Sequence, residues 1–105
     1  MAAYGSASGY SRQQMLNARQ HAQDALAWLE VNHEEWASLK LACYEAAEEG
    51  RRLSSRAVLD VCKSLKPSAL PAIAPIMRLL HPQAARGLAQ RHTACDVAVF
   101  KLLDL

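Results

Sequence analysis

Basic side chains are concentrated in the second half of the chain. Counted from Asp, Glu, Lys and Arg, residues 1–50 carry a net charge of −4 and residues 51–105 a net charge of +6. Between residues 51 and 91 there are eight basic residues and a single acidic one, Asp60. Lysine and arginine neutralise phosphate groups, so a segment of this composition predicts binding to a nucleic acid.

A pattern typical of a helix-turn-helix lies at the start of this basic segment. An acidic helical stretch ends at Gly50, a link of three residues follows, and Ser54 or Ser55 can cap the next helix. The second helix of such a motif presents its first residues to the bases of the major groove. A plain helical hairpin has the same pattern. The DNA contacts that we expect from the motif are Arg51, Arg52, Ser55, Arg56, Lys63 and Lys66.

The first half of the chain offers an acidic face instead. Six glutamates fall within residues 30–49, and five of them are the candidate partner contacts, namely Glu34, Glu35, Glu45, Glu48 and Glu49. Adjacent positions on a helix do not face each other, so the pairs indicate a solvated surface and not an acid–base pair. The alternative function is therefore that of a small interaction protein. In this function, the acidic face of residues 30–49 mimics nucleic-acid phosphates and occupies the surface of a host nucleic-acid-binding protein. In size and in its lack of catalytic groups, the chain resembles the small phage inhibitors of host nucleic-acid machinery, including anti-CRISPR proteins.

The remaining reactive residue types do not form a catalytic or metal-binding pattern. Cys43 and Cys62 fall on apolar helix faces, where a thiol stays protonated. His92 and Cys95 have the spacing of one half of a zinc site, but no second pair follows. The four glycines are isolated, so the chain has no phosphate-binding loop. We expect a non-enzymatic protein without a metal or another cofactor.

Composition predicts that the elements carrying these residues are all helices. Among 105 residues there are 20 alanines and 15 leucines, but only one threonine and seven valines and isoleucines together. Alanine and leucine favour helices, and the scarcity of β-branched residues disfavours sheets. The length is that of one domain. We therefore predict a flexible tail at 1–10 and a single helical domain at 11–105, an all-α compact bundle of five or six short helices.

Caps, glycines and prolines indicate where the helices begin and end. Capping boxes start at Ser11 and Asn32, and Pro71 and Pro75 together predict a break in any helix that spans both. The predicted elements are helices at about 12–31, 33–49 and 54–65, a turn or broken stretch at 67–74, and helices at 75–80, 82–91 and 94–103. The second and third form the helix-turn-helix-like hairpin, at about 33–65.

The last predicted helix is apolar on nearly all sides, which is typical of a buried helix or of an interface between copies. We expect a homodimer formed through Phe100, Leu102 and Leu103. No apolar stretch is long enough to span a membrane, since the longest has nine residues, two of them prolines. The chain also lacks a signal-peptide pattern and has an odd number of cysteines without a CxxC motif. A cytoplasmic protein is therefore expected.

Overall fold

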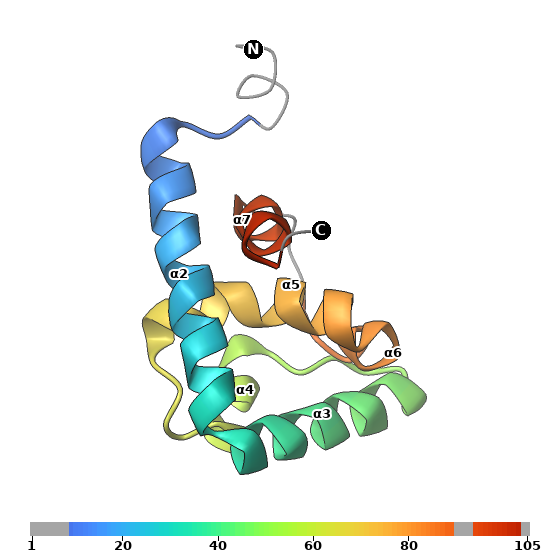
Figure 1. Cartoon of the computed structure of the whole chain (residues 1–105). Helices are drawn as coiled ribbons and strands as arrows, with labels where there is room; N and C mark the ends of the chain where they lie inside the picture. The colour runs from blue at the N-terminus through green and yellow to red at the C-terminus, as the bar shows by residue number, and fades with distance from the viewer. Residues whose placement is uncertain (1–8, 90–93, 104–105) are drawn as a thin grey trace.

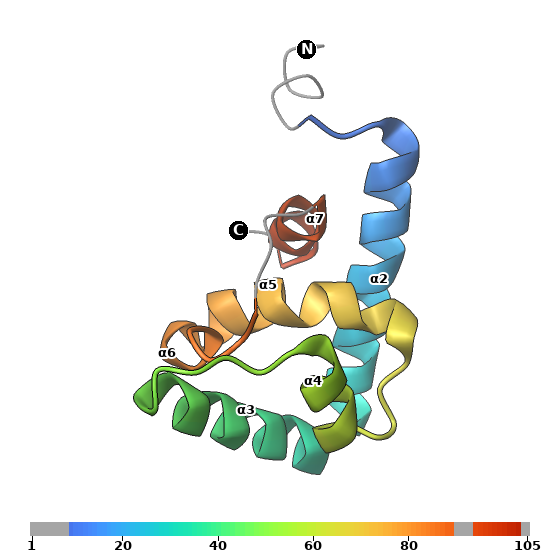
Figure 2. The same cartoon turned by 180° about the vertical axis from the view of Figure 1, so that it is seen from behind.

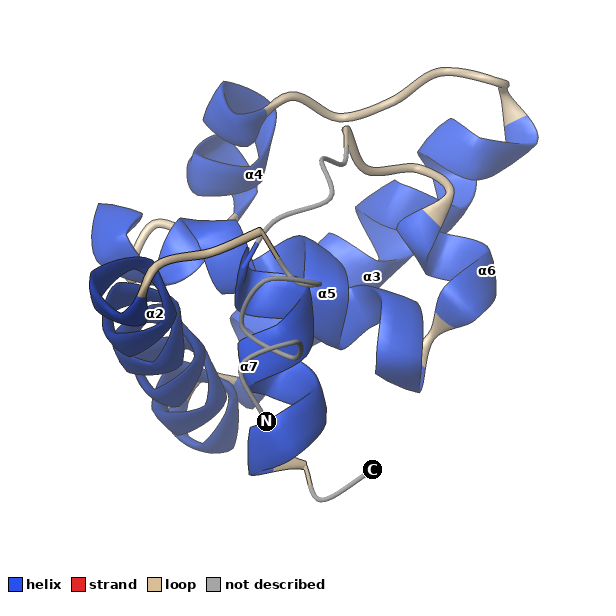
Figure 3. Cartoon of the chain, turned by 90° about the horizontal axis from the view of Figure 1, so that it is seen from above, coloured by secondary structure: helices blue, strands red, loops and turns tan. Residues whose placement is uncertain are grey.

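The structure is a computed structural model that describes residues 9–89 and 94–103. Within this part the chain is all-α, which confirms the predicted class, and every described element is a helix, a turn or a loop (Figure 3). The elements are α2 (Arg12–Val31), α3 (His33–Glu48), α4 (Ser55–Val61), η1 (Pro67–Ala69), α5 (Leu70–Leu80), α6 (Pro82–Ala85) and α7 (Ala94–Leu102). No described helix has the length and apolar character needed to cross a lipid bilayer.

Helix α5 lies in the middle of the molecule, with α7 on one side and α3 on the other (Figure 1). Helix α2 runs along all three and packs against α7 and α5. The residues that α2 buries are small except for one, namely Ala18, Ala22, Ala25 and Trp28. Small side chains let neighbouring helices approach closely, and the core is completed by fully buried residues such as Leu39, Ile76 and Val99.

The two predicted capping boxes have different outcomes. At the start of α2, the Ser11 hydroxyl accepts a hydrogen bond from the Gln14 amide at 3.1 Å, and the Gln14 side chain accepts one from the Ser11 amide at 2.7 Å. At the start of α3, the predicted box is wrong, because the Asn32 side chain caps nothing and donates to the Trp28 carbonyl at 3.0 Å. Glu35 is instead bound to Ser64, which follows α4.

The connection between α3 and α4 is bounded by Gly50 and the Ser54 N-cap, as the sequence predicted, but it is extended and does not form a tight turn. It covers residues 49–54 and runs back along α3, so α4 lies over the first half of α3 (Figure 2). The extension is held by backbone pairing, since the Leu53 amide donates to the Gly87 carbonyl at 2.7 Å and the Ala89 amide donates to the Leu53 carbonyl at 3.0 Å. Helix α4 then ends at Val61, earlier than predicted.

The prediction for the proline-rich segment was wrong. A 3-10 turn at Pro67–Ala69 leads directly into α5, which begins at Leu70 and contains Pro75 in its interior. Pro71 lies in the first turn, where no amide hydrogen bond is lost. The apolar face of α5, including Pro75, Ile73 and Ile76, is buried in the core. Burial of this face offsets the hydrogen bond that Pro75 cannot donate.

Two further helix boundaries can be compared with the sequence-based prediction. The helix predicted at 82–91 is wrong in length, because α6 ends at Ala85 and a turn follows at residues 86–87. Arg91 lies outside the described residues. The helix predicted at 94–103 is confirmed to within one residue by α7.

Candidate nucleic-acid interface

Three arginines from two separate segments line one hollow of the surface. Arg51 and Arg52 come from the link after α3, and Arg86 comes from the turn after α6. The hollow has a volume of about 400 Å³, and Ala47, Gly50 and Leu88 complete its lining. We call this the arginine hollow. Among the described residues, none in its lining is acidic, so the site is suited to an anion.

Gly50 directs the link into this position by ending α3 with a Schellman motif. Its φ of 70° is in the left-handed region, where glycine is favoured. The Arg51 amide then donates to the Ala46 carbonyl at 2.9 Å, and the Gly50 amide to the Ala47 carbonyl at 3.2 Å. The two arginines that follow therefore leave the helix in a fixed direction.

Gly87 brings the third arginine to the same place. A Cβ atom at this position would lie 2.0 Å from the backbone carbonyl oxygen of Cys43, so only glycine fits between the turn and α3. The pairing of Leu53 with Gly87 and Ala89 fixes the link against this turn. Backbone contacts thus hold Arg86 beside Arg51 and Arg52, and its position does not depend on a contact of its own side chain.

The three arginines differ in how far their charge is already neutralised. The Arg51 Nε atom lies 3.2 Å from Oε1 of Glu49, and both side chains are about half exposed. Such a pair contributes little to stability and exchanges easily for another anion. Arg52 and Arg86 are exposed and have no ion-pair partner among the described residues.

The other predicted DNA contacts begin at α4. Its N-cap is Ser54, whose hydroxyl accepts a hydrogen bond from the Ala57 amide at 3.2 Å. Ser55 and Arg56 are exposed in the first turn, as a DNA-reading helix would require. They follow Arg52 by three and four residues along the chain, but neither is part of the lining of the arginine hollow.

The two lysines of the prediction lie toward the other end of α3. Lys63 is exposed just after α4, and Lys66 lines a different hollow together with Asp24. The neighbouring Ser64 contacts Glu35 in the first turn of α3, whereas the arginine hollow begins beyond its last turn. With a rise of about 1.5 Å per residue, roughly 20 Å of helix separates the two places.

Arg86 is the residue of the hollow that the sequence did not single out. It stands in no motif, and a turn between two short helical segments carries no local signal for phosphate binding. Only the long-range pairing of the link with residues 87–89 places it beside Arg51 and Arg52. A different basic residue, Arg78, is already paired with Asp96 of α7.

The five glutamates of the predicted acidic face divide into two sets. Glu34, Glu45 and Glu48 are exposed on α3. Glu49 is paired with Arg51, and Glu35 accepts hydrogen bonds from the Ser64 amide, at 3.0 Å, and from the Ser64 hydroxyl. The two hydrogen bonds from Ser64 hold the pKa of Glu35 below its ordinary value. The Glu35 carboxylate is thus already hydrogen-bonded within the protein.

The thiols have the inert character that the sequence predicted. Cys43, Cys62 and Cys95 are all buried, and none of them forms a disulfide bond among the described residues. Burial raises the pKa of Cys43 to about 11 and, together with the nearby charge of Glu35, the pKa of Cys62 to about 12. Such thiols stay protonated near neutral pH and are poor nucleophiles.

A metal-binding cluster of three or more His, Cys, Asp or Glu side chains is absent from the described part of the chain. His92, the other half of the candidate pair with Cys95, lies outside that part. Comparison with protein-family models, with curated proteins and with solved structures gives no match. The function must therefore be argued from the surfaces described above.

The residues expected to form a homodimer are partly used within the chain. Leu102 and Leu103 pack against the core, whereas Phe100 is 48% exposed. Helix α7 thus has a covered side against α2 and α5 and an exposed side toward solvent.

Proposed function

We propose that the protein is a small, non-enzymatic nucleic-acid-binding protein and that the arginine hollow binds phosphate groups of the nucleic acid. The observation that supports this proposal is the meeting of Arg51, Arg52 and Arg86 around one hollow whose described lining contains no acidic residue. Two of the three side chains have no ion-pair partner among the described residues, so their charge is available to a ligand.

The chemistry of the hollow fits a phosphate better than it fits a single carboxylate. A guanidinium group presents a planar fork of N–H donors that matches phosphate oxygens. Three such groups around one hollow can contact more than one phosphate, and Arg51 can exchange the exposed Glu49 carboxylate for a phosphate oxygen. The proposal depends on this hollow and not on a tight helix-turn-helix, because the connection before α4 spans residues 49–54.

Sequence preference, if the protein reads DNA, would come from the start of α4. Arg56 and Ser55 are exposed there, a few residues after Arg51 and Arg52 in the sequence. Arginine commonly donates two hydrogen bonds to guanine in the major groove. Replacing Arg56 by alanine is then expected to cost about 1–3 kcal/mol for one preferred base and much less for the others.

The experiment is a titration of fluorescently labelled duplex DNA and of single-stranded RNA at several salt concentrations. The test variant is Arg52→Ala/Arg86→Ala, and the matched control is Arg12→Ala/Arg19→Ala, which removes two exposed arginines near the start of α2. The salt slope should fall by about one for each lost phosphate contact in the test variant and stay unchanged in the control.

Two outcomes contradict the proposal. One is a wild-type protein that shows no salt-dependent binding to any nucleic acid offered. The other is a test variant that binds as tightly as the control, since the arginine hollow would then have no part in binding. Thermal unfolding of both variants checks that neither change affects the fold, because all four arginines are exposed.

A second candidate function is favoured by the exposed face of α3. Leu41 is 60% exposed and Tyr44 is 40% exposed, and both lie among the glutamates Glu45 and Glu48. Exposed apolar residues within a charged surface are typical of protein interaction sites. In this alternative the protein is an inhibitor, like the phage proteins noted above, and it covers a basic surface of a host nucleic-acid-binding protein.

A pull-down from cell extract with and without nuclease separates the two functions. Capture that nuclease abolishes supports binding through a nucleic acid. Capture that survives nuclease and is lost in Glu45→Lys/Glu48→Lys supports the inhibitor. The control for this second variant is Glu30→Lys/Asp60→Lys, which makes the same change of charge at exposed positions outside the α3 face.

A further inference from the structure

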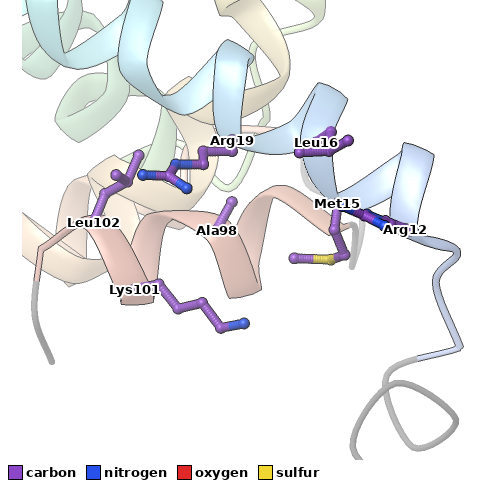
Figure 4. A pocket seen from close by; sticks show the side chains of 7 residues that line it. All are labelled: Arg12, Met15, Leu16, Arg19, Ala98, Lys101 and Leu102. Atoms are coloured by element: carbon purple, nitrogen blue, oxygen red, sulfur yellow. The ribbon is translucent and has the colours of Figure 1, made fainter.

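A second hollow, with a different character, lies between α2 and α7. Its floor is apolar and is formed by Met15, Leu16, Ala98 and Leu102 (Figure 4). Its edges carry the three cations Arg12, Arg19 and Lys101, and the described residues of the lining include no acidic one. The volume is about 330 Å³. An occupant of this groove must therefore combine apolar side chains with negative charge.

The exposed face of α3 has that combination. It contains Leu41 and Tyr44, which are 60% and 40% exposed, and the exposed glutamates Glu34, Glu45 and Glu48. Counted from Leu41, the other four positions lie seven residues before it and three, four and seven residues after it, so all five lie on one side of the helix. The opposite side, with Trp36, Leu39 and Cys43, is buried in the core. We call the exposed side the α3 face.

We propose that the α3 face of one copy of this protein docks in the α2–α7 groove of another copy. Leu41 and Tyr44 then cover the apolar floor around Leu16, and the glutamates face the cations of the groove. This is the mode in which an amphipathic helix binds a hydrophobic groove, here with opposite charges along its edges.

One molecule cannot fill its own groove. Arg12, Met15 and Leu16 lie in the first turns of α2, whereas α3 begins directly after its last turn (Figure 1). From Leu16 to Val31, α2 extends about 22 Å. Because the groove and the α3 face are different surfaces at opposite ends of α2, the contact is head-to-tail and leads to a ring or an open chain.

The charges disfavour a symmetric dimer in which one groove joins another. Such a dimer would bring two sets of Arg12, Arg19 and Lys101 together. Like charges at a few ångströms repel, and the described residues of the lining include no acidic side chain that would compensate. The head-to-tail contact instead places opposite charges against each other.

The experiment uses complementary charge reversals in the whole chain. The groove variant is Arg12→Glu/Arg19→Glu and the face variant is Glu45→Lys/Glu48→Lys. The matched controls, with the same changes of net charge at exposed sites, are Arg56→Glu/Lys63→Glu and Glu30→Lys/Asp60→Lys. Sedimentation velocity over a wide range of protein concentration measures association, and thermal unfolding checks the fold of each variant.

The wild type and both controls should show an increase of the weight-average sedimentation coefficient with concentration, and this increase should be smaller at high salt. The groove variant alone and the face variant alone should lose it. A mixture of the two should recover it, because the reversed groove of one fits the reversed face of the other, and the remaining wild-type surfaces still match.

Three results overturn the proposal. The first is a wild type that is monomeric at every concentration, which would leave the groove to a different partner. The second is a face variant that associates like the wild type, which would indicate a groove-to-groove or another contact. The third is a mixture that stays monomeric. Because Arg52→Ala/Arg86→Ala should associate normally, failure of this proposal is distinct from failure of nucleic-acid binding.

Discussion

Replacing Gly87 by alanine is the sharpest test of how the fold builds the arginine hollow. A Cβ atom at this position would lie 2.0 Å from the Cys43 carbonyl oxygen and 2.9 Å from its carbonyl carbon. Since Cβ atoms are essentially never found closer than 3.0 Å to another atom, the turn and α3 must separate by about 1 Å. Both neighbours are backbone atoms of packed elements, so neither can move alone.

The expected cost follows from the overpacking and from the hydrogen bonds beside it. Overpacking costs about 1–3 kcal/mol, and displacement of the turn weakens the hydrogen bond from Leu53 to Gly87, which contributes about 1 kcal/mol. The total of about 2–4 kcal/mol lowers the free energy of unfolding and, at about 4–8 °C per kcal/mol, lowers Tm by roughly 10–30 °C. Urea unfolding and a thermal scan measure both quantities.

Gly50→Ala is the matched control, because its strain comes from the backbone conformation and not from a close contact. A Cβ atom at Gly50 meets nothing within 4 Å, but the φ of 70° is unfavourable for alanine. The cost should therefore be about 1–2 kcal/mol from conformation alone. The reasoning is refuted if Gly87→Ala unfolds at the same urea concentration as the wild type, or if it is more stable than Gly50→Ala. Gly87→Ala should also bind nucleic acid more weakly, since it displaces Arg86.

Three further predictions concern caps, pH and thiols. Ser54→Ala removes the cap of α4 and should lower the free energy of unfolding by about 1 kcal/mol in a urea titration, and no change would exclude the cap. The bonds from Ser64 lower the pKa of Glu35 in the folded state, so its stabilising effect is present above the ordinary value of 4.5 and is lost as pH falls through the folded pKa. The Tm of Glu35→Gln should therefore lie below that of the wild type at pH 7, and the difference should vanish in acid; a constant difference contradicts this cause. With pKa values of about 11 and 12 and full burial, Cys43 and Cys62 should not react with a disulfide reagent at pH 8 until urea unfolds the protein, so rapid labelling of the folded chain would be inconsistent with the packing.

Local signals in the sequence were sufficient for the helix class and for many boundaries. The Ser11 capping box, the Gly50 C-terminus and the start of α7 are each encoded by a few neighbouring residues, and the structure has them where the sequence indicated. The buried positions of Cys43 and Cys62 followed from helical periodicity in the same way.

The features that the sequence did not reveal depend on contacts between distant segments. Glu35 has the right spacing for a capping box with Asn32, but Ser64 arrives from beyond α4 and binds it instead. Local rules disfavour a proline inside a helix, but Pro75 lies in the interior of α5. Burial of the apolar face of α5 in the core explains this exception. Gly87 lies within the helix predicted at 82–91, whereas in the structure its lack of a side chain allows a close approach to α3.

The basic residues of segment 51–91 lie at different places on the molecule, so a ligand bound at one of these places contacts only some of them. Of its eight basic residues, Arg51, Arg52 and Arg86 share the arginine hollow, Arg78 is paired with Asp96, and Lys66 lies toward the opposite end of α3. A ligand that contacts only the hollow therefore neutralises about three phosphates, and the salt slope for duplex DNA should be about −3. A slope near −7 would require the nucleic acid to reach Lys63 and Lys66 as well, some 20 Å farther along α3. That result would contradict a binding site confined to the hollow and would show that the whole basic segment is in contact with the nucleic acid.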